Sequence, residues 1–264
     1  MDIADEPPLL QCLRIQGRVM HALLLREIIT RFGRENLGVI WLVGEPMLFT
    51  SGIVTLWSMV TLHHGSAIPI VAFAVTGYSS VLLWRNCATH AAGAIAQNKS
   101  LLFHRNVRIV DVLLTRIVVE IGGATGSFIV LSLLFIYIGW MPMPDNLLKV
   151  LFGWTMLAWF GTSLALLIGA ATAFSELVPR LWNPVSYLMF PISGAAFMVD
   201  WLPERLQNIV LLLPMVHGVE ILREGYFHNA VAAHYNLGYM ASCCLILSLS
   251  GLYVVHQASR HVDF

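Results

Sequence analysis

Charged side chains are scarce in this sequence: Asp, Glu, Lys and Arg make up only 11% of its 264 residues, while 58% are hydrophobic. A soluble domain carries roughly 25% charged residues, because water must wet its surface. The shortage indicates that most of the surface faces lipid, and the mean hydropathy of +0.75 agrees. The net charge is zero, so no overall positive field favours nucleic acid as a partner.

A nucleotide-binding P-loop is also missing. No G-x-x-x-x-G-K-[ST] motif occurs, and the only lysines, Lys99 and Lys149, follow no glycine-rich loop. The chain therefore has no P-loop route to ATP hydrolysis. If it performs ATP-driven transport, another chain must bind the ATP and its magnesium, and we expect no cofactor on this one.

Metal sites and disulfides have little support in the sequence. It contains no H-E-x-x-H motif, and its four cysteines form no C-x-x-C pair. His217 and Glu220 have the i, i+3 spacing that di-metal helical bundles use. Such bundles need several more carboxylates, and the apolar runs offer only Glu45 and Glu120. We therefore expect no metal ion and no catalytic residue.

The sequence does contain apolar runs long enough to cross a membrane. Each crossing of about 30 Å of hydrocarbon needs about 20 apolar residues. We predict six membrane-spanning helices, at about 37–62, 67–98, 117–141, 150–175, 181–199 and 235–259. The predicted fold class is an all-α integral membrane protein in which residues 1–264 form a single transmembrane domain.

An amphipathic helix is predicted before the first span, at residues 9–34. Arg14, Arg18 and His21 share one helical stripe there, among regularly spaced apolar residues. We interpret the segment as an interface helix on the membrane surface, with its cations toward lipid headgroups. The alternative is an ordinary cytosolic helix packed on another element.

Two further segments interrupt the pattern of spans. The polar stretch 98–108 predicts a cytoplasmic loop or short helix. The apolar run 206–219 is too short to cross a bilayer, and Pro214 splits it. We predict that residues 203–230 form a re-entrant pair of short helices.

Basic residues are distributed unevenly between the two sides of this topology. The far side keeps only Lys149, Arg205 and Arg223, which predicts that both termini are cytoplasmic. In the third span, Gly122 and Gly126 form a G-x-x-x-G pair, which lets another helix approach closely. We expect that helix to belong to the same chain.

Three separated motifs then follow one another along the chain. The first is R-E-I-I-T-R-F-G from Arg26, continued by Trp41 and Glu45-Pro46. The second holds Gly93, Asn98, Leu101, Arg105, Asp111, Arg116 and Glu120. The third is P-M-V-H-G-V-E-I-L-R, from Pro214 to Arg223. In this order they resemble the ABC-2 type permeases that export capsular polysaccharide, although relatives that export O-antigen, teichoic acid or small drugs share the third motif.

The resemblance implies a homodimer of six-span subunits in the bacterial inner membrane, with two cytosolic ATP-binding subunits beneath it. The cargo would be a lipid-linked polysaccharide, passed on to periplasmic and outer-membrane export proteins. The interface helix and the 98–108 loop would contact the ATPase. The expected coupling residues are Arg26, Glu27, Arg31, Phe32, Leu101, Phe103 and Arg105.

The resemblance also implies that 203–230 is a periplasmic gate, with Pro214, His217, Glu220 and Arg223 as its key residues. The last three lie at i, i+3 and i+6, so they share a helical face. We favour a hydrogen-bond and charge network that holds the gate over direct contact with the substrate.

A path for a sugar polymer needs polar and aromatic walls, because sugar rings pack their C–H faces on aromatic rings and anionic sugars attract arginine. The candidates are Trp41, Glu45, Tyr78, Arg85, His90 and Tyr187. For the aromatic residues the alternative is an interfacial anchor. For Arg85 it is a salt bridge or a reach to the headgroups, and for Glu45 a structural or gating role.

Two other classes of function remain open. A proton- or sodium-coupled carrier would use an interrupted helix such as Glu45-Pro46, but no counterpart stands out in the second half of the chain. A membrane enzyme could pair Ser79 or Ser80 with His90, but no local motif supports that chemistry.

Overall fold

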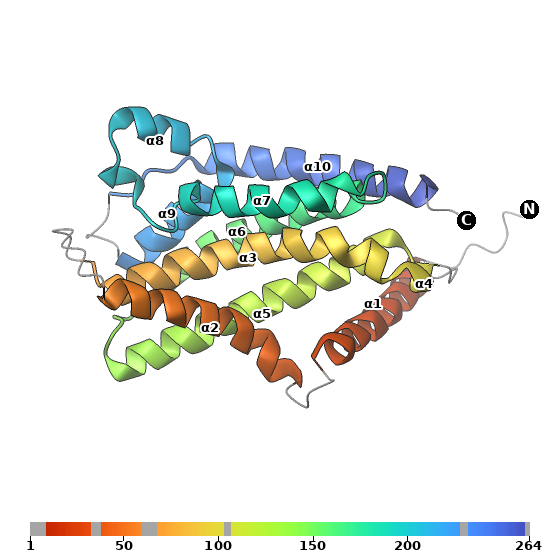
Figure 1. The fold of residues 1–264 in the computed structure, drawn as a ribbon, viewed down its shortest axis with the longest axis horizontal. Coiled ribbons are helices and arrows are strands. Elements are labelled where there is room, and N and C mark those ends of the chain that lie inside the picture. Colours follow the sequence, from red (N-terminus) through yellow and green to blue (C-terminus); the bar gives the residue numbers. More distant parts are fainter. Residues whose placement is uncertain (1–8, 33–37, 60–67, 103–106, 228–231, 262–264) are drawn as a thin grey trace, which may run out of the picture.

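The computed structural model describes residues 9–32, 38–59, 68–102, 107–227 and 232–261. Every regular element in these ranges is a helix, which confirms the predicted all-α class. The helices are α1 (Leu9–Phe32), α2 (Gly38–Met59), α3 (Ile70–Gln97), α4 (Lys99–Leu102), α5 (Ile109–Ile138), α6 (Leu147–Ala171), α7 (Leu177–Ile192), the 3-10 turn η3 (Val199–Trp201), α8 (Glu204–Val210), α9 (Pro214–Phe227) and α10 (Leu237–His261). Figure 1 shows the long helices running roughly side by side in an elongated bundle.

Helix α3 is the centre of the bundle, because α2, α5, α6, α7 and α9 all pack against it. Much of its surface consists of small residues, and Ala74, Ala88 and Ala91 are completely buried. Helix α6 comes close enough that a Cβ atom at Gly161 would lie 2.9 Å from the Cα of Trp84. This close packing fixes the direction in which the polar side chains of α3 can point.

Helices α6 and α9 meet through two reciprocal pairs of glycine and leucine. A Cβ atom at Gly153 of α6 would lie 2.7 Å from the backbone nitrogen of Leu222 in α9. A Cβ atom at Gly218 of α9 would lie 2.6 Å from the Cγ of Leu157 in α6. The leucine of each helix thus packs against a glycine of the other. These two contacts anchor α9 to the bundle.

The turn between α5 and α6 has recognisable end signals. Helix α5 ends at Ile138 and is capped by Gly139, whose φ of +84° is a left-handed conformation that glycine adopts without strain. Asn146 caps the start of helix α6, because its Oδ1 accepts a hydrogen bond of 3.1 Å from the Lys149 N–H. The Asn146 N–H donates to the Gly225 carbonyl at 2.8 Å, so this turn also supports the end of α9.

Among the described residues, α5, α6 and α10 are each long and apolar enough to cross a membrane. Helices α8 and α9 pass the same test only as a pair, bent by 108° at the break between them. The predicted interruption at Pro214 is therefore confirmed. Helix α7 has 16 residues, which at 1.5 Å per residue span about 24 Å, less than the hydrocarbon core.

The helix that contains the third predicted span begins before that span. We expected the span to start near residue 117, and α5 begins at Ile109, so Asp111 and Arg116 lie inside a helix with only 1% and 6% of their surfaces exposed. Both charged groups have partners in the bundle: Gln16 donates to Asp111, and Arg116 pairs with Glu27. A rule that treats charged residues as ends of spans cannot anticipate such pairing.

Helix α1 packs against α5 and α2. The side chains of Arg14, Arg18 and His21 are exposed, as the predicted cationic stripe requires. Their contact with lipid headgroups stays a prediction.

The close approach of α2 and α5 differs in register from the predicted G-x-x-x-G pair. A Cβ atom at Gly123 would meet Leu42 at 2.8 Å, and one at Gly126 would meet Val43 at 2.9 Å. A Cβ atom at Gly122 would meet no atom within 4 Å. The partner helix belongs to the same chain, as expected, but Gly123 rather than Gly122 forms the contact.

Candidate functional site

Two cavities adjoin each other along one face of α3, since Thr89 and His90 line both. The first has a volume of about 350 Å³ and lies between α1, α3 and α5. The second has a volume of about 460 Å³ and lies between α2, α3 and α7. Together they form a polar and aromatic wall that runs from the end of α3 toward its middle.

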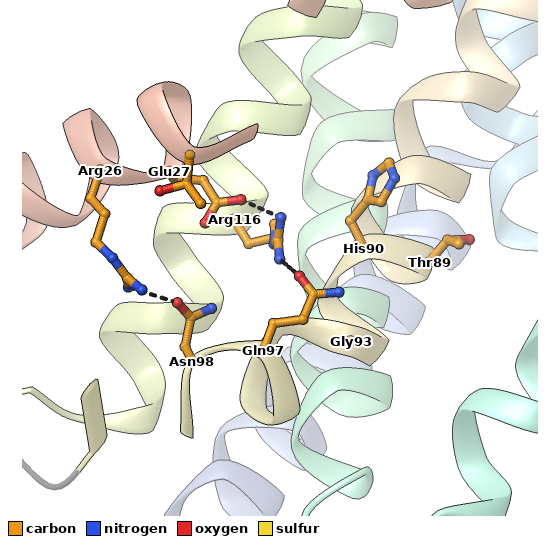
Figure 2. Close-up of a pocket in the computed structure, with 9 residues that line it drawn as sticks. Arg26, Glu27, Thr89, His90, Gly93, Gln97, Asn98 and Arg116 are labelled. Atoms are coloured by element: carbon orange, nitrogen blue, oxygen red, sulfur yellow. Dashed lines mark hydrogen bonds and ion pairs between the residues drawn. The ribbon is translucent and has the colours of Figure 1, made fainter. Parts of the chain in front are cut away.

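The first cavity ties α1 to the rest of the bundle, as Figure 2 shows. Arg26 of α1 donates to the Asn98 side chain at 2.9 Å. Glu27 forms an ion pair with Arg116 of α5, and Arg116 also donates to the Gln97 side chain. Arg116 and Glu27 are 7% and 14% exposed, so both charges are largely removed from solvent.

The wall shared by the two cavities rests on a second pair. The Nδ1 atom of His90 lies 2.8 Å from the Oε1 of Glu120 in α5. Glu120 is buried, whereas 29% of the His90 side chain is exposed. Thr89 is fixed from another side, because the Trp182 indole N–H of α7 donates to its hydroxyl at 3.1 Å. Helices α5 and α7 therefore hold the shared wall from both sides.

The second cavity brings together several predicted path residues. Glu45 of α2, Arg85 and His90 of α3, and Tyr187 of α7 all line it. The Arg85 guanidinium lies 4.2 Å from the centre of the Tyr187 ring. These four residues come from three helices that are far apart in the sequence, with Arg85 and His90 both on α3.

Two other predicted path residues lie elsewhere. Tyr78 is buried one level deeper, with its ring 5.2 Å from that of Phe190, which lines the cavity. Trp41 is 42% exposed and is not among the residues that line the second cavity.

Arg223 of α9 is completely buried and donates hydrogen bonds to several backbone carbonyls. Its Nη1 atom donates to Gly194 at 2.6 Å and to Phe197 at 2.7 Å, and its Nη2 atom donates to Ala195 at 2.7 Å. These carbonyls follow the end of α7, where no further helical turn would satisfy them. The guanidinium also stacks at 4.0 Å over the ring of Phe73 in α3.

Glu220 holds two connecting segments at once. Its Oε1 accepts a hydrogen bond of 3.2 Å from the Val199 N–H, and its Oε2 accepts one of 3.2 Å from the His234 N–H. The first segment leads from α7 into α8, and the second leads into α10.

His217 acts in the same way one turn earlier in α9. Its Nε2 lies 2.8 Å from the Leu211 carbonyl oxygen, and its Nδ1 accepts from the Asn236 N–H at 3.0 Å. Pro214 is the first residue of α9, directly after the bend. The three polar residues thus bond the backbone of separate segments, and their role in gating stays a prediction.

The predicted coupling residues are only partly visible. Arg26 and Glu27 have the partners described above, and Leu101 lies half-buried in α4. Phe103 and Arg105 lie outside the described residues, as do the side chains of Arg31 and Phe32. Contact of this region with an ATPase stays a prediction.

The sequence interpretation gave no role to several residues that build these sites. Four of these residues hold α1 and His90 in place. Asn98 and Arg116 appeared only as parts of a motif, Glu120 was also weighed as a metal-site carboxylate, and Gln97 did not appear. One signal was available: Arg116 and Glu120 are charged and one helical turn apart at the edge of an apolar run, which is costly in lipid unless both have partners.

Comparison with known proteins places the chain in a family. The family model for the ABC-2 type transporter matches residues 18–227. The capsule polysaccharide export inner-membrane protein CtrC of Neisseria meningitidis serogroup A is 43% identical over 254 residues, which cover 96% of each chain.

Two further relatives agree. BexB of Haemophilus influenzae, a protein of the same description, is 40% identical over 263 residues, covering 100% of this chain and 99% of the relative. The polysialic acid transport protein KpsM of Escherichia coli is 25% identical over 249 residues, covering 90% and 92%. The family match and the full-length identity together show that this chain belongs to the ABC-2 type transporter family.

Proposed function

We propose that the chain is the permease subunit of an ATP-driven exporter that moves lipid-linked capsular polysaccharide across the bacterial inner membrane. The observation that carries this proposal is the similarity to capsule polysaccharide export inner-membrane proteins over 96% to 100% of the chain. The permease is not itself an enzyme, since ATP hydrolysis in this family belongs to a separate subunit.

The proposed topology has six spans: α2, α3, α5, α6, α7 and α10. Figure 1 supports it, because the C-terminal end of α10 lies at the same end of the bundle as α1 and α4. This end would face the cytosol, with α1 on the inner leaflet and α4 toward the ATPase. The bent pair α8 and α9 lies at the opposite end and would form the periplasmic gate.

The proposed assembly is a homodimer on two ATP-binding subunits, in contact with periplasmic and outer-membrane export proteins. The second cavity supports the dimer, because it lies between α2 and α7. Helix α7 also exposes apolar residues, including Leu181 at 62% and Leu188 at 73%. A second copy across this side would turn an open polar wall into an enclosed path.

A gene deletion tests the function. Cells that lack this chain should keep the finished polymer inside, and the chain supplied on a plasmid should restore it to the surface. The matched control is deletion of the ATPase subunit, which should give the same retention. Surface polymer at the parental level in the deleted strain would refute the proposal.

Purification tests the division of labour. The chain should co-purify with a P-loop ATPase, and polymer should raise the ATP hydrolysis of the complex in nanodiscs. Transport by the chain alone in vesicles would contradict the proposal and favour a stand-alone carrier.

A further inference from the structure

Another cavity lies where the ends of several helices meet. It has a volume of about 680 Å³ and is lined by the end of α3, by α4, by the turn between α6 and α7, by the start of α7 and by His261 at the end of α10. Figure 1 shows α4 and the end of α10 at the same end of the bundle. Spanning helices end where hydrocarbon gives way to headgroups, so this cavity opens at headgroup level on the side proposed as cytosolic.

Part of the wall of this cavity is apolar. Ala92 and Ile95 of α3 line it and are buried, and Leu102 of α4 is half-buried. Phe174, in the turn after α6, is 49% exposed, and its ring lies 5.4 Å from that of His261. An apolar wall below a polar rim suits a molecule that is apolar at one end and charged at the other.

The rim carries charges of both signs. Lys99 of α4 and Arg180 of α7 are cations, and Glu176, directly before α7, is a carboxylate. The Glu176 Oε2 lies 3.5 Å from the Arg180 Nη2, and the two side chains are 91% and 72% exposed. An exposed pair of this kind contributes little to stability. Each of its charges can therefore bind a ligand at little cost to the fold.

The helix ends around the rim add partial charges of both signs. Helices α3, α6 and α10 end at this cavity, and the last carbonyls of a helix carry a partial negative charge. Helix α7 begins there, and the first N–H groups of a helix carry a partial positive charge. Most of these ends would repel a ligand that has only negative charge. A ligand with one negative and one positive group fits both the helix ends and the rim.

We propose that this cavity binds the headgroup of phosphatidylethanolamine from the inner leaflet. Lys99 and Arg180 donate charge-assisted hydrogen bonds to its phosphodiester, and its ammonium donates to Glu176. The two charges of this headgroup are only two carbon atoms apart. The headgroup therefore lies alongside the Glu176–Arg180 pair, with each of its charges next to the opposite one. The glycerol and the first methylenes pack against Phe174 and Leu102.

This inference goes beyond the proposed function and uses only its topology. One lipid would contact α4, the start of α7 and the end of α10, three segments that are separate in the sequence. A ligand that binds the folded state stabilises it. The lipid would thereby hold the proposed ATPase-contacting helix against the rest of the bundle.

The decisive experiment measures lipid binding to the complete permease–ATPase complex by native mass spectrometry. The complex is titrated in detergent with phosphatidylethanolamine, phosphatidylcholine or phosphatidylglycerol that carry the same acyl chains. Phosphatidylcholine has the same two charges but no N–H donor on its nitrogen, and phosphatidylglycerol lacks the positive charge. Phosphatidylethanolamine should reach half-saturation at a concentration about tenfold lower than either of the others, the range of one charge-assisted hydrogen bond.

The variants assign the two charges of the headgroup to residues. Glu176→Gln should reduce the preference for phosphatidylethanolamine over phosphatidylcholine to about twofold or less. Arg180→Gln should weaken the binding of both lipids by about tenfold and leave the preference intact, because both lipids carry the phosphate. The matched controls are Glu204→Gln and Arg205→Gln, two exposed positions of α8 at the opposite end of the bundle, and they should bind all three lipids like the parent.

A photoreactive phosphatidylethanolamine, with its reactive group next to the ammonium, tests the location. Peptide mapping of the labelled complex should find the label within residues 92–102 or 172–180, and an excess of unlabelled phosphatidylethanolamine should suppress it. Labelling elsewhere in the chain would overturn the inference. If the isolated chain were labelled in these ranges and the complete complex were not, the cavity would be a site for the ATPase and not for a lipid.

Three binding results would also overturn the inference. One is equal affinity for phosphatidylethanolamine and phosphatidylcholine in the parent. Another is an unchanged preference in Glu176→Gln. The third is tightest binding of phosphatidylglycerol, which would assign the cavity to an anionic lipid. All of these measurements are made without polymer, whereas the deletion test reads export alone. Failure of this inference is therefore distinguishable from failure of the proposed function.

Discussion

The carboxylate of Glu27 in α1 forms an ion pair with the guanidinium of Arg116 in α5, 89 residues further along the chain. Both side chains are largely buried, and Arg116 also donates to Gln97 at the end of α3. The helix that opens the described chain is therefore attached to two helices of the bundle by a single guanidinium. Any movement of α1 would therefore act on α3 and α5 through this guanidinium.

Breaking this ion pair should loosen α1. Glu27→Gln leaves the Arg116 charge buried without a carboxylate, and we expect a loss of about 3 kcal/mol in the free energy of unfolding. Thermal unfolding of the purified chain in detergent measures it. The exposed Arg18→Gln on the same helix is the control and should change stability by less than about 0.5 kcal/mol. Equal stability of Glu27→Gln and the parent would show that the pair contributes nothing.

Arg223→Lys should release the segment after α7. A lysine cannot reach the carbonyls of Gly194, Ala195 and Phe197 together, because it lacks the planar fork of donors. We expect a loss of about 2–4 kcal/mol in stability, from buried carbonyls left without donors. Faster proteolysis within residues 193–203 would report it. The exposed Arg205→Lys is the control and should be cleaved at the rate of the parent. If Arg223→Lys were also cleaved at that rate, Arg223 would not hold the segment after α7.

Glu220→Gln should impair export by loosening the proposed gate. Both carboxylate oxygens accept a backbone N–H, one from Val199 and one from His234. The amide of glutamine keeps only one acceptor, so one bond is lost, at a cost of about 1–2 kcal/mol. Surface polymer per cell is the measurement, with the exposed Glu204→Gln as control. Unaltered secretion in Glu220→Gln would count against the network.

One alanine substitution tests the packing of α6 on α9, and a second, at Gly122 of α5, is its control. Alanine favours a helix over glycine by about 1 kcal/mol, so Gly122→Ala, where nothing lies within 4 Å of the new Cβ, should be neutral or stabilising. Gly153→Ala places its Cβ 2.7 Å from the Leu222 backbone nitrogen and should cost about 1–3 kcal/mol. Detergent melting curves compare them, and a gain for Gly153→Ala would disprove the tight contact.

Phe103→Ala tests the coupling loop predicted from the sequence, since Phe103 itself lies outside the described residues. Phe103 is expected to offer an apolar side chain to the ATPase. Its loss should uncouple ATP hydrolysis from export, so that the ATPase no longer responds to polymer and secretion falls. If both ATPase stimulation and secretion survived this change, the coupling role of Phe103 would be dropped.

The sequence predicted the arrangement of elements well where the pattern was strongly periodic or had a clear break. The break at Pro214 was predicted, and the structure has α8 and α9 on either side of it. The sequence did not predict that the helix of the third span extends back to Ile109, because the cost of Asp111 and Arg116 in a helix depends on partners from α1. The packing glycine was also misjudged by one position, since the face of α5 that meets α2 is set by the whole bundle.

The candidate site, too, was predicted only in part from the sequence. Residue chemistry was enough to select Glu45, Arg85, His90 and Tyr187 as candidates for a polar path, and these four line one cavity. It could not separate them from Trp41, which is not part of that cavity. In the sequence, an aromatic residue that anchors the protein at the membrane interface looks the same as one that lines a substrate path. Only the neighbouring helices distinguish them.

By itself, the sequence determined that this chain is a helical membrane protein without a P-loop. Low charge, long apolar runs and a missing motif can all be recognised from the sequence alone. Only the tertiary structure decided which charges are compensated. It gives Arg116 a carboxylate and Arg223 a set of carbonyls, yet leaves Arg85 with an aromatic ring beside a cavity. The physical reason is that the free energy of a charge in a membrane protein depends on what lies within a few ångströms of it, and helices distant in sequence supply those neighbours.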